Sequence, residues 1–451
     1  MLLSELVLDI RTLRYRYEHS DLTPSSLLVE RLYPKISSAE AKGVWTYLVP
    51  KPDLLQRAAE LERQSPETRQ QLPLWGIPFS VKDCIDIANL PTSCACDRFT
   101  YTAEATNPVV QALLDAGAIL IGKTNLDQFA TGVVGVRTDF GIPRNPFNAD
   151  YIPGGSSSGA AVSVARQFVS FAIGTDTGGS GRVPAALNNV VGLKPTRGLL
   201  STRHTIPACR TLDCISIFAL NVADAAEVFE VAQGFDPLDP FSRQAPPAEA
   251  DKAIDAFTFG VPAEEFLQFH GNQDVEARFR EAIARLIDLG GICKTIDYAP
   301  LLEATNLLFK GTWIAERYAS VGRFVEENPE AVHPAVRTAV LNSKSLSAVQ
   351  VFEDQYKLAN IRRAIAPMWE AIDVLVVPTI GTTYTIAEVE ANPIDLNLKL
   401  GYYTNFVNLL DLAAVAIPYG FQSNGVPCGI SLIGRAFSEP YLIQLGAKFT
   451  N

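Results

Sequence analysis

The sequence predicts an α/β fold in which helices cover both faces of a β-sheet. From Ile77 onward, short apolar runs bounded by glycine alternate with helical segments: IPFSV, VVQALLDAG, AILIG, AAVSVARQ, FVSFAIG and AALNNVVG. The alternation resumes after a proline-rich stretch with AFTFGVP, VEARFREAIARLIDLG, VLVVP and LLDLAAVAIPYGFQ. Strands that alternate with helices in this way are typical of a sheet with helices on both sides.

A helical layer is predicted ahead of the sheet, over residues 1–70. Apolar residues recur there with the spacing of one helix face: Leu2, Leu3, Leu6, Ile10 and Leu13. Thr23 and Pro24 then begin a second helix, SSLLVERLYPKI, because a threonine cap followed by proline is a signal for a helix start.

One domain spanning residues 1–451 is predicted, with an internal linker. Residues 234–252, GFDPLDPFSRQAPPAEADK, hold four prolines and mark this linker. The linker joins a first core half, 71–233, to a second core half, 253–451, which continues the α/β style without a repeat of fixed period.

The composition excludes some classes of function. Of the 451 residues, 47% are hydrophobic and 19% are charged, which suits a compact enzyme better than a disordered or fibrous chain. The formal net charge is -11, and no dense basic run interrupts the acidic balance. Because such a surface repels phosphate groups, neither a nucleic acid nor a membrane is expected as a partner.

The cysteines and the N-terminal residues predict a cytoplasmic protein. The seven cysteines are scattered and form no CxxC pair, which indicates buried thiols in a reducing compartment and no metal site. Glu5, Asp9 and Arg11 interrupt the apolar stretch that a signal peptide needs, and no apolar window long enough to span a membrane follows.

Two motifs fit known patterns in an unsuitable context. Residues 117–124, GAILIGKT, match the phosphate-loop pattern, yet their variable positions form a strand and a helix precedes them, so no phosphate site is expected. Residues 155–159, GSSSG, match the nucleophile-elbow pattern, but a loop precedes them where a strand is required. A serine triad completed by His204, His270 or His333 stays open as the alternative.

Two glycine-rich bends carry five small hydroxyl residues: Ser156, Ser157, Ser158, Thr177 and Ser180. A helix and a returning strand separate the bends, so both can lie at the same end of the sheet. The second bend, GTDTGGSGR, precedes a helix start near Val183, and its backbone N–H groups can form a concave site for an oxyanion. Ser180 is the candidate nucleophile, and a simple tight turn is the alternative.

A base for this serine must come from elsewhere in the chain. Lys82 ends the apolar strand in GIPFSVKDCIDI, beside Asp83. A lysine buried there loses the hydration of its ammonium form, so its pKa falls and the neutral amine can accept a proton. The alternative is a solvated or salt-bridged lysine at a strand end.

The blocks that hold these residues resemble the amidase signature family in order and spacing: GIPFSVKD, GAILIGKTN, PGGSSSGAA, GTDTGGSGRVPAA and GLKPTRG. The resemblance extends from Ile77 to Ile433. It implies the amidase signature fold, in which helices cover both faces of a large twisted mixed β-sheet. It also implies a triad of Lys82, Ser156 after a cis peptide bond, and the nucleophile Ser180, with Ser156 relaying a proton between the other two.

The resemblance also implies which backbone groups hold the oxyanion. The donors would be the N–H groups of Thr177, Gly178, Gly179 and Ser180. Gly155 would precede the cis bond.

Four neighbouring residues are expected to support the bends. Asp176 and Arg182 flank the nucleophile and should pair with each other. Ser157 and Ser158 should cap the following helix, because a side-chain oxygen at a helix start can accept a free backbone N–H.

Further blocks in both halves are similar to the allophanate hydrolases of that family: TNLDQFATGVVGVRTDFGIPRNPFN, CRTLDCISIFAL, KGTWIAERY and GYYTNFVNLLDLAAVAIPYGFQ. This similarity implies hydrolysis of allophanate (urea-1-carboxylate) through an acyl-enzyme, with release of ammonia and ultimately carbon dioxide. It assigns Arg317 to the substrate carboxylate, as a fixed cationic fork. Without it, an arginine on a helix beginning near Thr312 would be read as a surface charge. Phe309 stands where these enzymes tend to have a substrate-binding tyrosine, so binding should be weaker or the preferred amide should differ.

Other functions stay open at this point. They are a general small-amide hydrolase, the A-type subunit of a glutamine-dependent amidotransferase, and a non-catalytic scaffold. The presence of all three triad residues argues against the scaffold. We expect a small-molecule amide substrate, no cofactor and, from the family, a homodimer. Allophanate hydrolases often continue into a smaller C-terminal domain, which we expect to be absent here together with any step that it performs.

Overall fold

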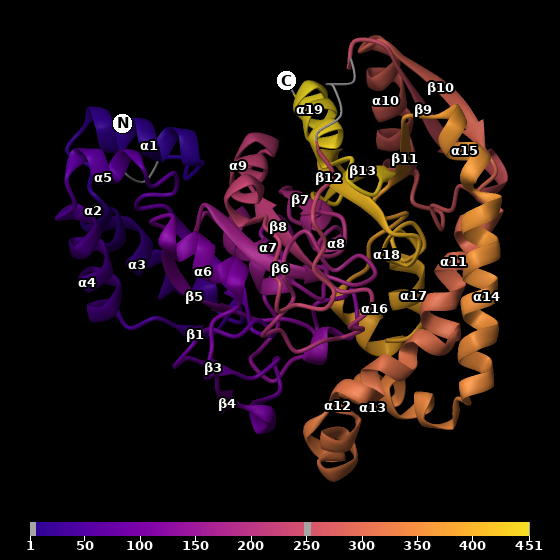
Figure 1. The fold of residues 1–451 in the computed structure, drawn as a ribbon, viewed down its shortest axis with the longest axis horizontal. Helices are drawn as coiled ribbons and strands as arrows, with labels where there is room; N and C mark the ends of the chain where they lie inside the picture. The colour runs from indigo at the N-terminus through magenta and orange to yellow at the C-terminus, as the bar shows by residue number, and fades with distance from the viewer. Residues whose placement is uncertain (1–5, 248–253, 451) are drawn as a thin grey trace.

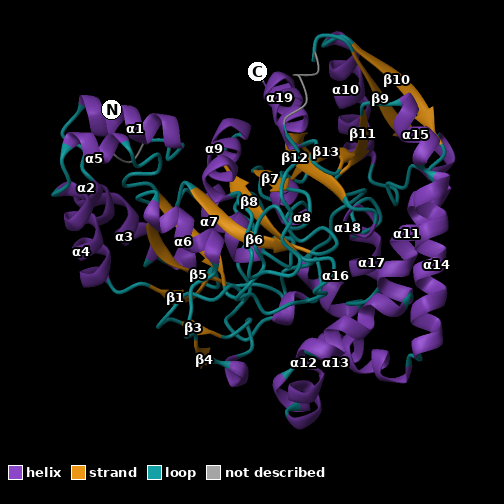
Figure 2. Ribbon diagram, viewed as in Figure 1, coloured by secondary structure: helices purple, strands orange, loops and turns teal. Residues whose placement is uncertain are grey.

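The computed structural model describes residues 6–247 and 254–450, apart from the side chain of Phe309. In Figure 1 the N-terminal helices form one flank in indigo, the strands cross the middle, and the helices of residues 299–371 form the opposite flank. Figure 2 shows the strands in orange with helices on either side of them. This arrangement confirms the predicted α/β fold.

The strands have the following bounds: β1 Trp45–Leu48, β2 Pro78–Lys82, β3 Pro91–Thr92, β4 Tyr101–Thr102, β5 Ile119–Thr124, β6 Phe171–Asp176, β7 Val191–Lys194, β8 Cys214–Ala219, β9 Phe257–Pro262, β10 Gly291–Ile296, β11 Val374–Pro378, β12 Leu412–Phe421 and β13 Pro427–Arg435. Within the described residues, eleven of them form one sheet in the order β1-β5-β2-β6-β8-β7-β12-β13-β11-β9-β10. β2 is parallel to both of its neighbours, β5 and β6, whereas β12 is antiparallel to β7 and β13. The predicted mixed sheet is therefore confirmed.

The central strands are buried on both faces. Every residue of β2, β6, β7, β8 and β11 is buried, as expected where helices cover both sides of a sheet. The helices that contact these strands and their neighbours are α4 Lys51–Glu62, α7 Ser158–Ala165, α8 Val183–Leu187, α9 Val222–Ala232, α10 Gln273–Asp288, α18 Phe406–Leu409 and α19 Glu439–Thr450. The helix α6 Pro108–Asp115 packs on α9.

The flank distant from the N-terminus is helical. Its helices are α11 Ala299–Lys310, α12 Ala315–Glu327, α13 Pro334–Leu341, α14 Ala348–Ala364 and α15 Ala366–Ala371, and α16 Ile386–Ala391, α17 Asp395–Leu400 and α18 Phe406–Leu409 follow β11. The helix predicted near Thr312 begins there as a single 3-10 turn, Thr312–Ile314, and continues as α12.

The N-terminal layer holds α1 Ile10–His19, α2 Pro24–Leu27, α3 Tyr33–Ile36, α4 Lys51–Glu62 and α5 Pro66–Gln70. The first helix begins later than the leucine spacing predicted. Asp9 accepts a hydrogen bond from the Thr12 N–H at 2.8 Å and caps α1, so the helix starts where this carboxylate can satisfy its first donors. Leu6 is buried ahead of the helix, and Leu2 and Leu3 lie outside the described residues.

The predicted linker lies partly within the described chain. Residues 234–247 form turns and segments without regular secondary structure, and 248–252 lie outside the described residues. The sheet crosses the predicted division, because β7 of the first half pairs with β12 of the second. The assignment of one domain in two halves stays a prediction.

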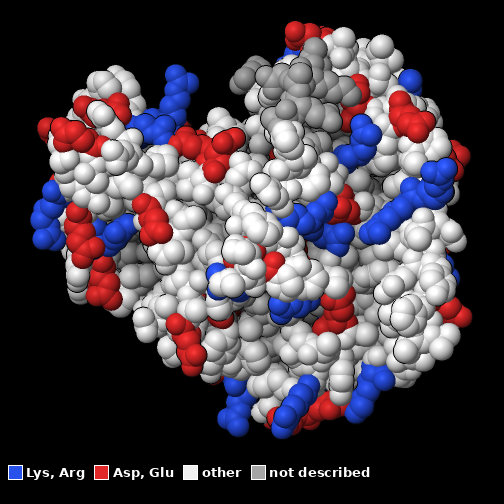
Figure 3. Space-filling model, viewed as in Figure 1, with Lys and Arg blue, Asp and Glu red and all other residues white. Residues whose placement is uncertain are grey.

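The cysteines are all free, and six of the seven are buried. Cys293 departs from the prediction of buried thiols because it lies exposed on the edge strand β10. None of the helices in the described ranges is long and apolar enough to cross a membrane. Acidic and basic side chains both lie on the face drawn in Figure 3.

Candidate active site

Lys82 is a fully buried amine with hydroxyl partners. It is the last residue of β2, and its Nζ donates to Ser156 Oγ at 2.8 Å and to Thr175 Oγ1 at 2.7 Å. Among the described residues no carboxylate forms an ion pair with it. Burial lowers the pKa of Lys82 below its ordinary value, although nearby carboxylates oppose the shift. The neutral amine can therefore reverse the bond to Ser156 and accept its proton.

Ser156 follows a cis peptide bond, as the family resemblance implied. The bond joins Gly155 to Ser156, and the Ser156 carbonyl accepts the Asp127 N–H at 3.0 Å. A Cβ added at Gly155 would overlap the Asp127 carboxylate. Only glycine fits this position without moving that side chain.

Asp127 fixes the loop that runs beside the two bends. Its buried carboxylate accepts four successive backbone N–H groups at 2.9 to 3.1 Å. The donors are Val134, Gly135, Val136 and Arg137. A carboxylate with several backbone donors is a strong anchor for a loop.

Ser180 lies between β6 and α8, at the start of the helix as predicted, and is 3% exposed. In the part of the chain that the structure describes, no hydrogen bond reaches its hydroxyl. Ser156 and Ser180 therefore form no hydrogen bond with each other, and of the expected relay the structure contains the bond between Lys82 and Ser156. Catalytic hydrogen bonds often tighten only when substrate is bound.

The four predicted oxyanion donors divide into two groups. The Gly179 N–H donates to Asp176 Oδ1 at 2.9 Å, and a donor held by a buried carboxylate is not free for an oxyanion. The N–H groups of Thr177, Gly178 and Ser180 have no hydrogen-bond acceptor among the described residues. Three of the four predicted donors are therefore available to an oxyanion, while Gly179 shapes the bend with its φ of +130°.

Asp176 and Arg182 form the expected pair. Arg182 donates to both carboxylate oxygens, each at 2.9 Å, and also to the Thr404 carbonyl at 3.0 Å. Burial opposes ionisation of Asp176, but Arg182 outweighs this and holds the pKa of the carboxyl below its usual value. The pair ties the nucleophile bend to the segment before α18.

The prediction that Ser157 and Ser158 cap α7 is wrong. Ser157 occupies the cap position, but its Oγ donates to the Thr175 carbonyl at 3.1 Å and makes no cap hydrogen bond. Ser158 Oγ donates to the Asn125 carbonyl at 3.5 Å. Both hydroxyls tie the first bend to neighbouring strands because those carbonyls lie within reach, while the start of the helix stays uncapped by side chains.

The alternative motifs are not supported. GAILIGKT contains the strand β5, in which Lys123 forms a buried ion pair with Asp83 at 2.7 Å, so the segment is a strand and not a phosphate loop, as predicted. Ser156, Ser157, Ser158 and Ser180 receive no hydrogen bond from a histidine within the described ranges. Nowhere in the described part of the chain do histidine, cysteine and carboxylate groups form a cluster suited to a metal.

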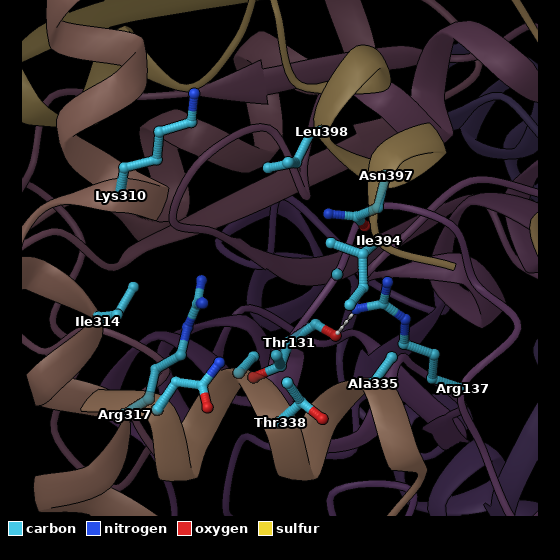
Figure 4. Close-up of a pocket in the computed structure, with 13 residues that line it drawn as sticks. Thr131, Arg137, Lys310, Ile314, Arg317, Ala335, Thr338, Ile394, Asn397 and Leu398 are labelled. Atoms are coloured by element: carbon cyan, nitrogen blue, oxygen red, sulfur yellow. Dashed lines mark hydrogen bonds between the residues drawn. The ribbon is translucent and has the colours of Figure 1, made fainter. Parts of the chain in front are cut away.

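A cavity of about 170 Å³ is lined by three cationic side chains, Arg137, Lys310 and Arg317. In Figure 4, Arg317 and Lys310 extend toward it from one side, and Asn397 and Arg137 lie on the other. Arg317 is 7% exposed and is therefore not a surface charge, and Arg137 is 3% exposed. Arg137 donates to the Thr131 carbonyl at 2.9 Å. The cavity therefore suits an anionic group. The side chain of Phe309 lies outside the described residues.

Asp213 connects the cavity with the nucleophile bend. Its carboxylate accepts a hydrogen bond from the Thr177 hydroxyl. The same carboxylate attracts the guanidinium of Arg317, which lines the cavity. Burial raises the pKa of Asp213 to about 6. Sequence reasoning missed Thr175, Arg137 and Asp213. Arg137 and Asp213 lie in blocks that carried the similarity to allophanate hydrolases, and Thr175 lies in the block GTDTGGSGRVPAA, but none of the three was assigned a role.

Comparisons with known proteins find similar sequences and structures over most of the chain. The family described as Amidase matches residues 28–443. The urea amidolyase of Saccharomyces cerevisiae is 41% identical over 436 residues, which cover 96% of this chain and 24% of the yeast protein. The allophanate hydrolase structure from Kluyveromyces lactis is 40% identical with a TM-score of 0.92, and the match covers 98% of this chain and 72% of that one.

More distant relatives match over most of their own length. The A-type subunit of the glutamyl-tRNA(Gln) amidotransferase of Acidobacterium capsulatum is 32% identical over 426 residues, which cover 86% of this chain and 88% of that protein. By contrast, the chain spans about a quarter of the two urea amidolyases.

Proposed function

This chain belongs to the amidase family, and on that premise we propose that it is a serine amidohydrolase whose substrate is allophanate. The observation that carries the proposal is the buried Lys82 amine, which touches the hydroxyls of Ser156 and Thr175 and whose pKa is lowered by burial. An amine in this setting is a base at neutral pH without a histidine.

The reaction begins at the terminal amide carbon. Ser180 Oγ attacks this carbon, its proton passes to Ser156 Oγ, and the proton of Ser156 passes to Lys82 Nζ. The negative charge that develops on the amide oxygen is held by the N–H groups of Thr177, Gly178 and Ser180. Lys82 then returns a proton through Ser156 to the nitrogen, and ammonia leaves an acyl-enzyme. Water attacks this carbamate ester by the same proton path, and the released dicarboxylate, which keeps the second nitrogen, breaks down to two molecules of carbon dioxide and a second ammonia.

The substrate class is supported by the cationic cavity and by the relatives. Allophanate carries a carboxylate, and the guanidinium of Arg317 can hold it through two parallel hydrogen bonds. The similarity to a urea amidolyase and to an allophanate hydrolase points to the same compound. A neutral amide would bring no opposite charge to the cationic cavity.

The experiment measures ammonia release by the purified chain from allophanate, biuret, malonamide and glutamine. For Arg317→Ala we expect KM for allophanate to rise at least about 10-fold, because a charge-assisted hydrogen bond is worth about 1.5–3 kcal/mol. Neutral amides should change little. Lys310→Ala is the matched control, since this exposed cation lines the same cavity, and its effect should be smaller. Turnover of neutral amides with no activity on allophanate would overturn the substrate assignment.

The A-type subunit of a glutamine-dependent amidotransferase is the second candidate, and the match to such a protein over 88% of its length favours it. Glutaminase activity that depends on a co-purifying protein would decide for it.

We further propose a homodimer and a reducing, cytoplasmic location. The family resemblance supports the first, and the seven free thiols support the second. Light scattering on the purified chain and fractionation of the source cells test them.

A further inference from the structure

Asn405 presents a buried acceptor that nothing in the described chain satisfies. The residue is 1% exposed, and its Oδ1 has no hydrogen-bond partner among the described residues. It occupies the position before α18 but makes no side-chain cap hydrogen bond. An unsatisfied buried acceptor is costly, so a group outside this chain is the natural partner.

The surroundings of Asn405 place it against the nucleophile bend. A Cβ added at Gly178 would lie 3.0 Å from Asn405 Oδ1 and 2.6 Å from a methyl carbon of Leu308. The neighbouring Thr404 fixes this segment, because its Oγ1 donates to the Gly178 carbonyl at 2.8 Å. Asn405 is therefore held beside one of the three free oxyanion donors.

The same side chain also lies next to the walls of the cationic cavity. Its amide packs against Gly401, directly after α17, and Asn397 and Leu398 of α17 line the cavity. Leu308 lies on α11, which ends at Lys310 on the opposite wall. Asn405 therefore lies beside the nucleophile bend at Gly178, and its other neighbour, Gly401, directly follows a helix that lines the cavity.

We propose that Asn405 determines specificity by accepting a hydrogen bond from the N–H that separates the two carbonyl carbons of the substrate. This proposal rests on the proposed function, because allophanate has one such N–H between its amide and its carboxylate. Malonamate, the analogue with a CH₂ group at this place, offers no donor and would leave Oδ1 unpaired. A site with a buried acceptor selects against such an analogue.

The test compares kcat/KM for allophanate and malonamate in wild type and in Asn405→Ala. Differences in intrinsic reactivity between the two compounds cancel in this comparison. We expect the preference for allophanate to fall about 10-fold in N405A, the value of one good hydrogen bond. Asn405→Asp keeps the shape and an acceptor, so its preference should stay near wild type even though both anions bind less well.

Each outcome separates the two claims. Equal losses on both substrates in N405A would make Asn405 a packing residue and overturn this proposal, while the proposed function stands. No ammonia from allophanate with wild type would overturn the proposed function and this proposal together. Labelling of Ser180 by a fluorophosphonate shows whether each variant keeps a folded active site, and N405D supplies the comparison if N405A does not fold.

Discussion

Lys82 and Lys123 lie on neighbouring parallel strands, and both are fully buried. Val81 is the register partner of Lys123, so the two amines occupy almost the same level of the sheet. Among the described residues, Lys82 forms hydrogen bonds only with the hydroxyls of Ser156 and Thr175. Lys123 instead meets the Asp83 carboxylate, the Thr92 hydroxyl and the Pro91 carbonyl. The difference between them lies in the partners.

Burial alone does not turn a lysine side chain into a base. Both lysines lose water, but Lys123 regains an opposite charge at 2.7 Å, which stabilises its ammonium form. Lys82 finds hydroxyl groups, which do not compensate the charge, and its pKa falls. One lysine can therefore take part in proton transfer while the other holds the strand β5 to the loop after β2.

The largest effect is expected for Lys82→Met, which removes the base. Without the amine, Ser156 has no base to pass its proton to, and we expect kcat/KM to fall about 10³- to 10⁴-fold, the usual contribution of general-base catalysis. Ammonia release and the rate of fluorophosphonate labelling measure it. An undiminished rate in this variant would mean that Lys82 is not the base.

Lys123→Met should lower the stability of the protein and leave its activity near wild type. It leaves Asp83 buried without its cation, so the free energy of unfolding should fall by about 3–5 kcal/mol, while kcat/KM of the folded fraction stays near wild type. Urea unfolding measures the loss.

The double variant Lys123→Met with Asp83→Asn is the matched control for that loss. It removes both charges and should recover part of the stability. If Lys123→Met unfolds no more easily than wild type but loses turnover, the assignment of the two lysines is reversed.

The smallest expected effect is on the pH dependence of kcat/KM. The rate should fall as pH decreases through the lowered pKa of Lys82, because the protonated amine cannot accept a proton. Thr175→Val removes one acceptor that stabilises the ammonium form, so the pKa should drop further. The acid limb of kcat/KM should then move to lower pH by up to about one unit.

Thr92→Val removes the equivalent hydroxyl from Lys123 and should leave the acid limb in place. A limb that moves upward in Thr175→Val, or equally in both variants, would contradict the assignment of this limb to Lys82.

The sequence predicted the features that depend on short-range patterns. The strand that ends at Lys82, the strand within GAILIGKT and the helix start near Val183 all follow from local periodicity and turn residues. Such patterns report which face of an element is buried. The mixed sheet and the cis bond came from the family resemblance.

Partners that are distant in sequence could not be predicted. Thr175 meets Lys82 from 93 positions away, and Asn405 meets Gly178 across about half of the chain. Both contacts depend on strand register and loop path, which no local pattern encodes. The serines at the first bend show the same limit: Ser157 bonds to a carbonyl of β6, which only the folded sheet brings near.

The absence of a side chain at position 155 couples two properties that an engineer would prefer to vary separately. Gly155 leaves room for the Asp127 carboxylate, which in turn anchors the backbone of Arg137 at the cavity. A bulkier residue would disturb the proton path and the anion pocket in one step. Substitutions that adapt the cavity to neutral acyl groups are therefore better made on the helical flank, from α11 to α12. Lys310 and Arg317 line the cavity there and do not depend on the contact between Gly155 and Asp127.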